Sequence, residues 1–239
     1  VFGANGGRPS HPELLDWLAR ELVRNGWSLK KLHRLIVTSA AYRQSSQANA
    51  EAVSKDSENR MLWRMSPRRI EAETIRDAVL AVCGELNPEM GGPSFRDVEP
   101  ERSGDNTAYA FVNAFSGELN RRTIYRRWVR RAHHPLLDAL DCADPSISTP
   151  RRPVTTTPLQ ALALLNNPFM LHASGAFVRR LMSEAGPDAG RQVERAYRLA
   201  YLRHPTEDET ASARRFITRH GLDQFCLVIF NSNEFVYVD

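Results

Sequence analysis

One loop gathers the side chains best suited to holding an anion. Two arginines, a hydroxyl and an amide share it: Arg151, Arg152, Thr155 and Gln160. Arginine binds carboxylate or sulfate in bidentate geometry, and the first turn of a helix offers free N–H groups to an anion. Because a helix is expected to start at Pro158, this loop is our first choice for a site. In the alternative interpretation, Thr157 only caps that helix and the arginines bind backbone carbonyls.

A second set of charged residues recurs at helical spacing between positions 68 and 77. Its members are Arg68, Arg69, Glu71, Glu73, Arg76 and Asp77. Opposite charges three and four positions apart would tie the surface of one helix together, for roughly a few tenths of a kcal/mol per pair. Alternatively, Arg68, Glu71 and Arg76 form the wall of a pocket for an acidic sugar.

His11 lies close in sequence to two carboxylates, Glu13 and Asp16. An imidazole with two carboxylates could hold a metal ion or move protons. Acidic residues in the first turn of a helix are also favoured by the helix dipole without any ligand. We keep His11 as a candidate ligand-binding residue and predict no metal site.

The densest basic and aromatic run lies between positions 121 and 134. It contains Arg121, Arg122, Arg126, Arg127, Arg130, Arg131, Tyr125, Trp128, His133 and His134. Basic side chains interleaved with rings are typical of single-stranded nucleic-acid sites. No signature of a nucleic-acid-binding fold accompanies them, so we do not expect that partner. Two interpretations stay open, namely internal pairing with acids and an anionic glycan surface that includes Arg122.

The short motifs of common enzyme classes are missing from the sequence. Four acids could supply a glycosidase carboxylate pair, but that mechanism depends on the separation of the two groups. These acids are Asp16, Glu71, Asp141 and Asp144. The three cysteines lack the spacing of a zinc site or a haem attachment. Catalytic residues are therefore left unassigned, and no cofactor is expected within this chain.

Composition indicates a globular protein. The 239 residues are 42% hydrophobic, which is enough for one large core or two small ones. No apolar run reaches the roughly 20 residues that cross a bilayer, so no membrane insertion is expected. The net charge is +4, yet 29 of the 32 basic residues are arginine and 28 acidic residues are spread among them. Genome composition alone can produce such an arginine bias, so the charge does not identify a partner.

Apolar periodicity predicts a mainly α-helical fold, a multi-helix bundle with a long irregular central loop. A capping box from Ser10 to Glu13 should start a first helix that ends near Asn25, and Ser28 should cap a second. Ser66-Pro67 should open a third helix, with Arg76 on its polar face. Segment 121–131 fits either a helix or a short strand, which leaves room for a short strand pair.

Glycine and proline in segment 87–118 indicate a connecting loop between a helical part, 1–86, and a second helical part, 119–239. We expect the two parts to form one integrated domain. Helical spacing recurs over 159–166, 169–184, 191–202, 207–220 and 222–231. Thr206 and Glu209 form a second capping box.

Several strings of this sequence resemble one protein family over nearly the whole chain. They are 10–19 (SHPELLDWLA), 32–45 (LHRLIVTSAAYRQS), 58–64 (ENRMLWR), 68–73 (RRIEAE), 150–162 (PRRPVTTTPLQAL) and 231–239 (NSNEFVYVD). The sequence is similar to the C-terminal domain of unknown function (family 1553) of planctomycete cytochrome-c-like multidomain proteins. That resemblance implies a fragment of a longer, secreted protein, periplasmic or extracellular, with upstream domains of the same chain as partners. It places any haem c in a missing upstream domain, and it assigns no activity to any residue.

Two functional hypotheses follow from these observations. In the first, the chain is an accessory or structural helical module that packs against upstream domains and binds an anionic, sulfated or uronic polysaccharide through arginines. In the second, it is part of an enzyme that acts on polysaccharide, by cleavage or by haem-coupled sugar oxidation. Nucleic-acid binding is a weaker third. One structural observation distinguishes a binding site from a purely structural role. Convergence of the candidate residues on one cleft would favour a site, and their scatter would favour a structural role; these residues are Arg68, Arg76, Arg122, Arg151, His11 and Gln160.

Overall fold

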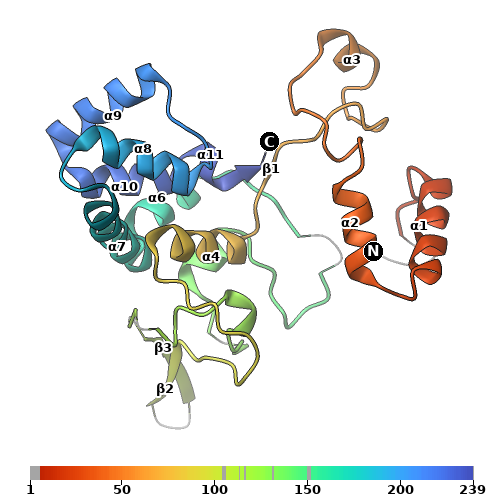
Figure 1. Ribbon diagram of the computed structural model, residues 1–239. Coiled ribbons are helices and arrows are strands. Elements are labelled where there is room, and N and C mark those ends of the chain that lie inside the picture. The colour runs from red at the N-terminus through yellow and green to blue at the C-terminus, as the bar shows by residue number, and fades with distance from the viewer. Residues whose placement is uncertain are drawn as a thin grey trace. The chain divides into compact units, whose positions relative to one another are not determined.

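The computed structural model describes residues 6–103, 106–112, 114–115, 117–130, 132–149 and 152–238. Its chain divides into two compact units (Figure 1). The first unit comprises Val1–Arg68 with Val238–Asp239, and the second comprises Arg69–Tyr237. The predicted connecting segment 87–118 thus lies inside the second unit. No helix among the described residues is long and apolar enough to cross a membrane.

The prediction of a mainly α-helical fold is confirmed. The first unit contains α1 (Pro12–Arg24), α2 (Leu29–Val37) and α3 (Ala50–Lys55). The second contains α4 (Ala72–Cys83), α5 (Pro135–Ala139), α6 (Pro158–Asn166), α7 (Pro168–Ala185), α8 (Ala189–Ala200), α9 (Glu207–His220), α10 (Leu222–Phe230) and α11 (Asn233–Val236). Strands form two small pairs, β1 (Arg68–Arg69) with β4 (Tyr237–Val238) and β2 (Val98–Ser103) with β3 (Asn106–Phe111).

In the first unit, the two helices predicted near the N-terminus are α1 and α2, and they pack together as a helical hairpin. Ser28 caps α2 as expected, because its hydroxyl accepts a hydrogen bond from the Lys31 amide. The capping box predicted at the start of α1 was wrong. His11 occupies the N-cap position without a side-chain bond to the helix, and the Ser10 hydroxyl hydrogen-bonds the His11 ring instead, at 3.0 Å. The helix begins one residue later than the box requires, so Ser10 precedes the N-cap and Glu13 does not occupy the N3 position.

The core lies in the second unit, where α7 packs against α4, α8 and α10. Two fully buried rings join α7 to α10, with the centroids of Phe177 and Phe230 5.4 Å apart. The capping box of Thr206 and Glu209 is confirmed at the start of α9. Figure 1 shows the β2–β3 hairpin at the end of the second unit away from α9.

Three local expectations need correction. The third helix begins at Ala72 rather than at Ser66-Pro67, because the backbone just before it pairs with the C-terminal strand. The Ile70 amide donates to the Val236 carbonyl at 2.9 Å. Segment 87–118 is not wholly irregular, since it contains the β2–β3 hairpin. Segment 121–131 is neither helix nor strand over its described residues, where a short 3-10 turn, Thr123–Tyr125, lies between two isolated β-bridges.

Candidate functional site

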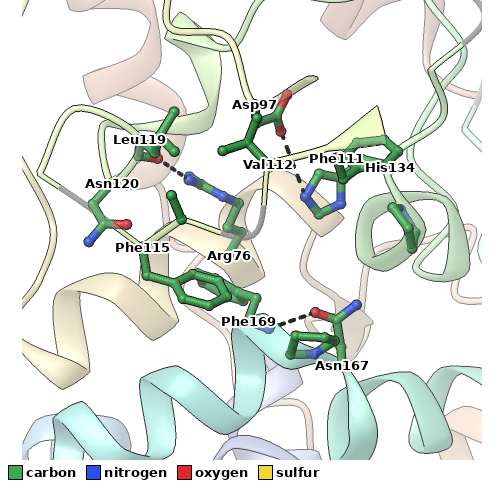
Figure 2. A pocket seen from close by; sticks show the side chains of 13 residues that line it. Arg76, Asp97, Phe111, Val112, Phe115, Leu119, Asn120, His134, Asn167 and Phe169 are labelled. Carbon is green, nitrogen blue, oxygen red and sulfur yellow. Dashed lines mark hydrogen bonds and ion pairs between the residues drawn. The ribbon is translucent and has the colours of Figure 1, made fainter. Parts of the chain in front are cut away.

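A cavity of about 270 Å³ in the second unit is the best candidate site (Figure 2). We call it the Arg76 pocket. Its walls combine aromatic rings with a few buried polar groups, which is the usual make-up of a small-ligand site. The lining residues are Arg76, Asp97, Phe111, Val112, Ala114, Phe115, Leu119, Asn120, His134, Pro135, Asn167, Pro168 and Phe169.

Arg76 reaches the pocket from the buried face of α4. It shares a stripe with Ala72, Val79 and Cys83, at steps of four, three and four residues, and all four residues are buried. The sequence interpretation placed Arg76 on the polar face instead. A guanidinium on a core stripe needs partners inside the protein, and its burial lowers the pKa of Arg76.

The partners of Arg76 are mostly uncharged oxygens. Its Nη2 donates to the Leu119 carbonyl at 2.6 Å, and its Nη1 donates to the Arg121 carbonyl at 3.0 Å and to Thr123 Oγ1 at 3.2 Å. The carboxylate oxygen that it contacts, Asp77 Oδ1, is 3.4 Å away. That oxygen already accepts the amide and hydroxyl of Thr123 at 2.8 and 2.6 Å. The charge of Arg76 is therefore only weakly compensated.

The base of the β2–β3 hairpin positions Asp97. The Val112 amide donates to the Asp97 carbonyl at 2.9 Å, which holds the carboxylate beside the pocket. A parallel bridge from Phe95 to Arg126 brings an arginine next to it, and Arg126 Nε donates to Asp97 Oδ2 at 2.6 Å. The Arg126 guanidinium also stacks on Trp128, 4.7 Å from the ring centroid. The carboxylate of Asp97 is thus hydrogen-bonded by Arg126, and its charge also acts on Arg76 over a longer distance.

His134 is held as a neutral imidazole. Burial, followed by the neighbouring Arg126 charge, lowers the pKa of His134 to about 4. Its Nδ1 accepts the Leu137 amide at 3.3 Å and so caps α5, while its Nε2 faces Asp97 Oδ2 at 3.8 Å. The ring also meets Phe111 edge-on, at 5.5 Å between centroids. Because Nδ1 serves as the cap of α5 and the pKa is low, His134 is poorly suited to take up a proton near neutral pH.

Phenyl rings and amides complete the pocket. Figure 2 shows the rings of Phe115 and Phe169 together beneath the Arg76 side chain. Their centroids are 6.3 Å apart, and the guanidinium carbon of Arg76 is 5.6 Å from the Phe169 ring. Asn120 Nδ2 donates to Glu85 at 3.4 Å, and Asn167 Oδ1 accepts the Phe169 amide at 3.0 Å. The Asn120 oxygen and the Asn167 nitrogen keep hydrogen-bonding capacity for a ligand.

The predicted loop site is only partly described, since Arg151 lies outside the described residues. Thr155 and Gln160 both join a network around Asp141. Asp141 accepts the Thr155 amide at 2.7 Å and Gln160 Nε2 at 3.1 Å, while Arg69 donates to Asp141 at 2.6 Å and to Gln160 Oε1 at 2.7 Å. Thr157 and Gln160 form a capping box on α6. A separate cavity of about 110 Å³ lies beside Arg69 and Gln160.

Arg152 and Glu71 meet in a different cluster, at the N-terminal end of α4. Arg152 Nη1 donates to both carboxylate oxygens of Glu73, at 2.9 and 2.7 Å, and lies 3.6 Å from Glu71. The hydrogen bonds that Arg152 donates to Glu73 raise the pKa of Arg152. Glu71 stays exposed, with 62% of its side chain accessible. The guanidinium of this predicted ligand-binding arginine is therefore occupied by acids of the same chain.

The remaining predicted residues do not line the Arg76 pocket. Arg122 is exposed on the strip between residues 121 and 130, whereas Arg121 and Arg126 of that strip are buried in internal contacts. His11 and Arg68 belong to the first unit. Within the second unit, the described candidates thus divide between the Arg76 pocket, the Asp141 network, the Glu73 cluster and the open surface.

Sequence reasoning missed most of the pocket. Asn167-Pro168 carries a local signal, because asparagine before proline often starts a helix, and Asn167 does cap α7. Asp97 carried no such signal, since it lies within the segment expected to be a loop. Its role depends on contact with residues 29 and 37 positions away, Arg126 and His134.

Neither a metal nor a haem is suggested by the described residues. They contain no group of three or more histidine, cysteine or acidic side chains arranged to hold a metal ion. Cys83, Cys142 and Cys226 are free thiols, two of them buried. None belongs to the Cys-x-x-Cys-His sequence that attaches haem c covalently.

Comparison with known proteins identifies a family without a known activity. Residues 1–217 match the family PSD1, described as a protein of unknown function (DUF1553). Neither the curated proteins nor the solved structures give a significant match.

Proposed function

This chain belongs to the PSD1 family of proteins of unknown function (DUF1553), and we propose that it is an accessory module that binds a negatively charged sugar unit in the Arg76 pocket. The observation that carries the proposal is the buried, weakly compensated guanidinium of Arg76 at the wall of that cavity. An arginine in this state gains most from a ligand with a carboxylate or sulfate, because such a group offers two oxygens in the plane of the guanidinium.

The other walls support a sugar rather than a bare anion. The phenyl rings of Phe111, Phe115 and Phe169 suit the apolar face of a sugar ring, and the amides of Asn120 and Asn167 suit its hydroxyl groups. At about 270 Å³ the cavity is slightly smaller than typical drug-sized sites, which begin near 300 Å³. It therefore suits one sugar unit or the end of a chain. A uronic or sulfated sugar combines all of these features, and a polysaccharide ligand fits the extracytoplasmic location that we also propose.

The geometry supports binding more than catalysis. An enzyme acting on a glycan needs a group that can move a proton at the reacting bond. His134 uses Nδ1 to cap α5 and has a pKa of about 4, which makes it a weak base near neutral pH, and Asp97 is paired with Arg126 at 2.6 Å. None of the four acids considered for a glycosidase pair lines the Arg76 pocket, and two of them are engaged elsewhere, since Asp141 is bound by Thr155 and Arg69 and Asp144 is bound by Ser146.

Calorimetric titration of the full chain with glucuronate and with uncharged glucose tests the proposal. We expect saturable binding of glucuronate and binding of glucose weaker by about tenfold or more, because only the former meets Arg76 with a charge. A sulfated hexose should behave like glucuronate. Equal binding of glucose and glucuronate, or no binding of any of these sugars, would contradict the proposal.

Variants locate the binding at the Arg76 pocket. Arg76→Lys keeps the charge but loses the planar fork, and Asn120→Asp adds a negative charge at nearly constant volume. Each should weaken glucuronate binding by about tenfold or more. Arg122→Lys makes the same chemical change as Arg76→Lys on an exposed arginine, and it should bind like the parent chain. The thermal unfolding temperature of each variant, compared with that of the parent chain, shows whether a loss of glucuronate affinity results from a loss of folded structure.

A further inference from the structure

The helical hairpin of the first unit leaves its apolar residues uncovered. Neither α1 nor α2 contains a buried residue, and Asn59 is the single buried residue among positions 6–68. Trp17 is 43% exposed and Leu14 is 44% exposed. Large apolar side chains gathered on one surface commonly mark an interaction site in a stable protein.

These residues line a groove of about 520 Å³, which we call the hairpin groove. Its apolar walls come from both helices of the hairpin and from the segment that follows them. They include Leu14, Trp17, Leu18, Leu35, Ile36 and Leu62. In α1 the positions 14, 17 and 18 recur at three- and four-residue steps and form one apolar stripe, and α2 adds the adjacent Leu35 and Ile36 to the same hollow. A groove between two amphipathic helices suits the apolar stripe of a third helix.

The segment after α2 is held in place by its own contacts. The Gln44 side chain donates to the Leu62 carbonyl at 2.9 Å, and the Met65 amide donates to the Ser45 carbonyl at 3.2 Å. Asn59 donates to the Arg64 carbonyl at 2.8 Å and to Ser66 Oγ at 3.0 Å. These bonds form one wall of the groove without any partner, so the surface is prepared before an occupant arrives.

The charge of the first unit indicates what kind of helix fits. This unit has 11 basic and 7 acidic residues, whereas the second unit has 21 of each, so the whole formal charge of +4 lies in the first unit. Arg64 and Arg68 line the groove itself. The described ion pairs of the unit are Arg24–Glu21 and Lys55–Glu51, so neither groove arginine has a described acidic partner.

We infer that the hairpin groove docks an acidic amphipathic helix of a partner protein. The apolar stripe of that helix enters between α1 and α2, and its acidic residues lie against Arg64 and Arg68. Complementary charge would add specificity and speed to an association whose affinity comes from apolar burial. This inference does not depend on the Arg76 pocket, which belongs to the other unit.

Two synthetic peptides test the inference on the full chain. Both are about 18 residues long with leucine at positions i, i+3, i+4 and i+7, and they differ only in having glutamate or lysine at the polar positions. Fluorescence anisotropy should show saturable binding of the glutamate peptide, about tenfold or more tighter than the lysine peptide. The preference should shrink as salt is raised.

Matched variants locate the docking surface. Leu35→Asp places a charge in the groove at a position that is already 37% exposed, and it should abolish binding of the glutamate peptide. Leu159→Asp is the control, because it makes the same change at a 65% exposed position of the second unit. This variant should bind the glutamate peptide as the parent chain does. Arg68→Glu should lower the affinity for the glutamate peptide by about tenfold. The difference in affinity between the glutamate and lysine peptides should therefore become smaller.

Other occupants give different results. Equal affinity for both peptides, no binding of either, or normal binding by Leu35→Asp overturns the inference. If sedimentation shows a dimer of the parent chain and a monomer of Leu35→Asp, the occupant is a second copy and the partner helix is wrong. If the parent chain binds phosphatidylserine vesicles, Leu35→Asp abolishes that binding, and the parent chain binds both peptides equally, the surface belongs to a membrane instead.

Discussion

The guanidinium of Arg69 lies 2.6 Å from the carboxylate of Asp141, although 72 residues separate them in the sequence. Both side chains are largely buried, at 6% and 15% exposure. Asp141 has a positive φ of 61°, a backbone conformation that aspartate and asparagine tolerate better than most residues. This pair fixes the loop before α6, which carries the residues that the sequence suggested as an anion site.

Removing the charge of Asp141 should destabilise the protein strongly. Asp141→Asn keeps the shape and the backbone preference but leaves Arg69 as a buried charge without its partner. Loss of one partner of a buried pair typically costs about 3–5 kcal/mol. Urea denaturation should show a reduced free energy of unfolding. Asp144→Asn is the control, because the Asp144 carboxylate bonds only the nearby Ser146 among the described residues, and it should change stability by less than about 1 kcal/mol. An equal decrease in the free energy of unfolding for both variants would show that the ion pair with Arg69 does not stabilise the protein more than an ordinary surface contact does.

His134 should make the protein less stable in mild acid. Its pKa falls from 6.5 to about 4 on folding, so between these values the unfolded chain binds more protons than the folded one. This contribution is fully present above pH 6.5 and is lost as the pH falls toward 4, by at most about 3 kcal/mol.

Urea denaturation at several pH values between 4 and 7 measures the effect of His134. His134→Asn can still cap α5 through its side-chain oxygen but cannot titrate, so it should flatten the dependence in this range. His133→Asn changes the adjacent histidine, whose side chain is 59% exposed, and should leave most of the dependence in place. If the free energy of unfolding changes with pH in the same way in the parent chain and in His134→Asn, the pH dependence does not come from His134.

The three thiols should react slowly while the protein is folded. Burial raises the pKa of Cys83 to about 11, and it raises the pKa of Cys142 and of Cys226 to about 12. Only the thiolate attacks an alkylating reagent, so at pH 8 the folded chain should be alkylated by iodoacetamide about 100-fold more slowly than the urea-unfolded chain. Mass spectrometry of timed samples reads this out for each cysteine. Rapid labelling of a folded cysteine would show a more exposed or activated thiol than its surroundings predict.

Local sequence signals determined much of the helical framework. The capping box of Thr206 and Glu209, the Ser28 cap and the apolar spacing of the later helices were readable because each involves residues within one or two turns of a helix. The local signal misled at the start of α1, which begins one residue later than the capping box from Ser10 to Glu13 predicts and has His11 at its N-cap. The mainly α-helical class follows from these short-range patterns.

Tertiary structure alone decided which polar groups meet. Arg76 could be assigned to a helix from its spacing, but its position on the buried stripe depends on the packing of α4 against α7. Asp97 faces Arg126 only because a hairpin and a β-bridge bring separate segments together, and Arg69 reaches Asp141 across 72 residues. Side-chain periodicity reports which residues share a face of one element. Contacts between elements depend instead on how the whole chain packs, because hydrogen bonds and ion pairs require close approach in space and carry no fixed spacing in sequence.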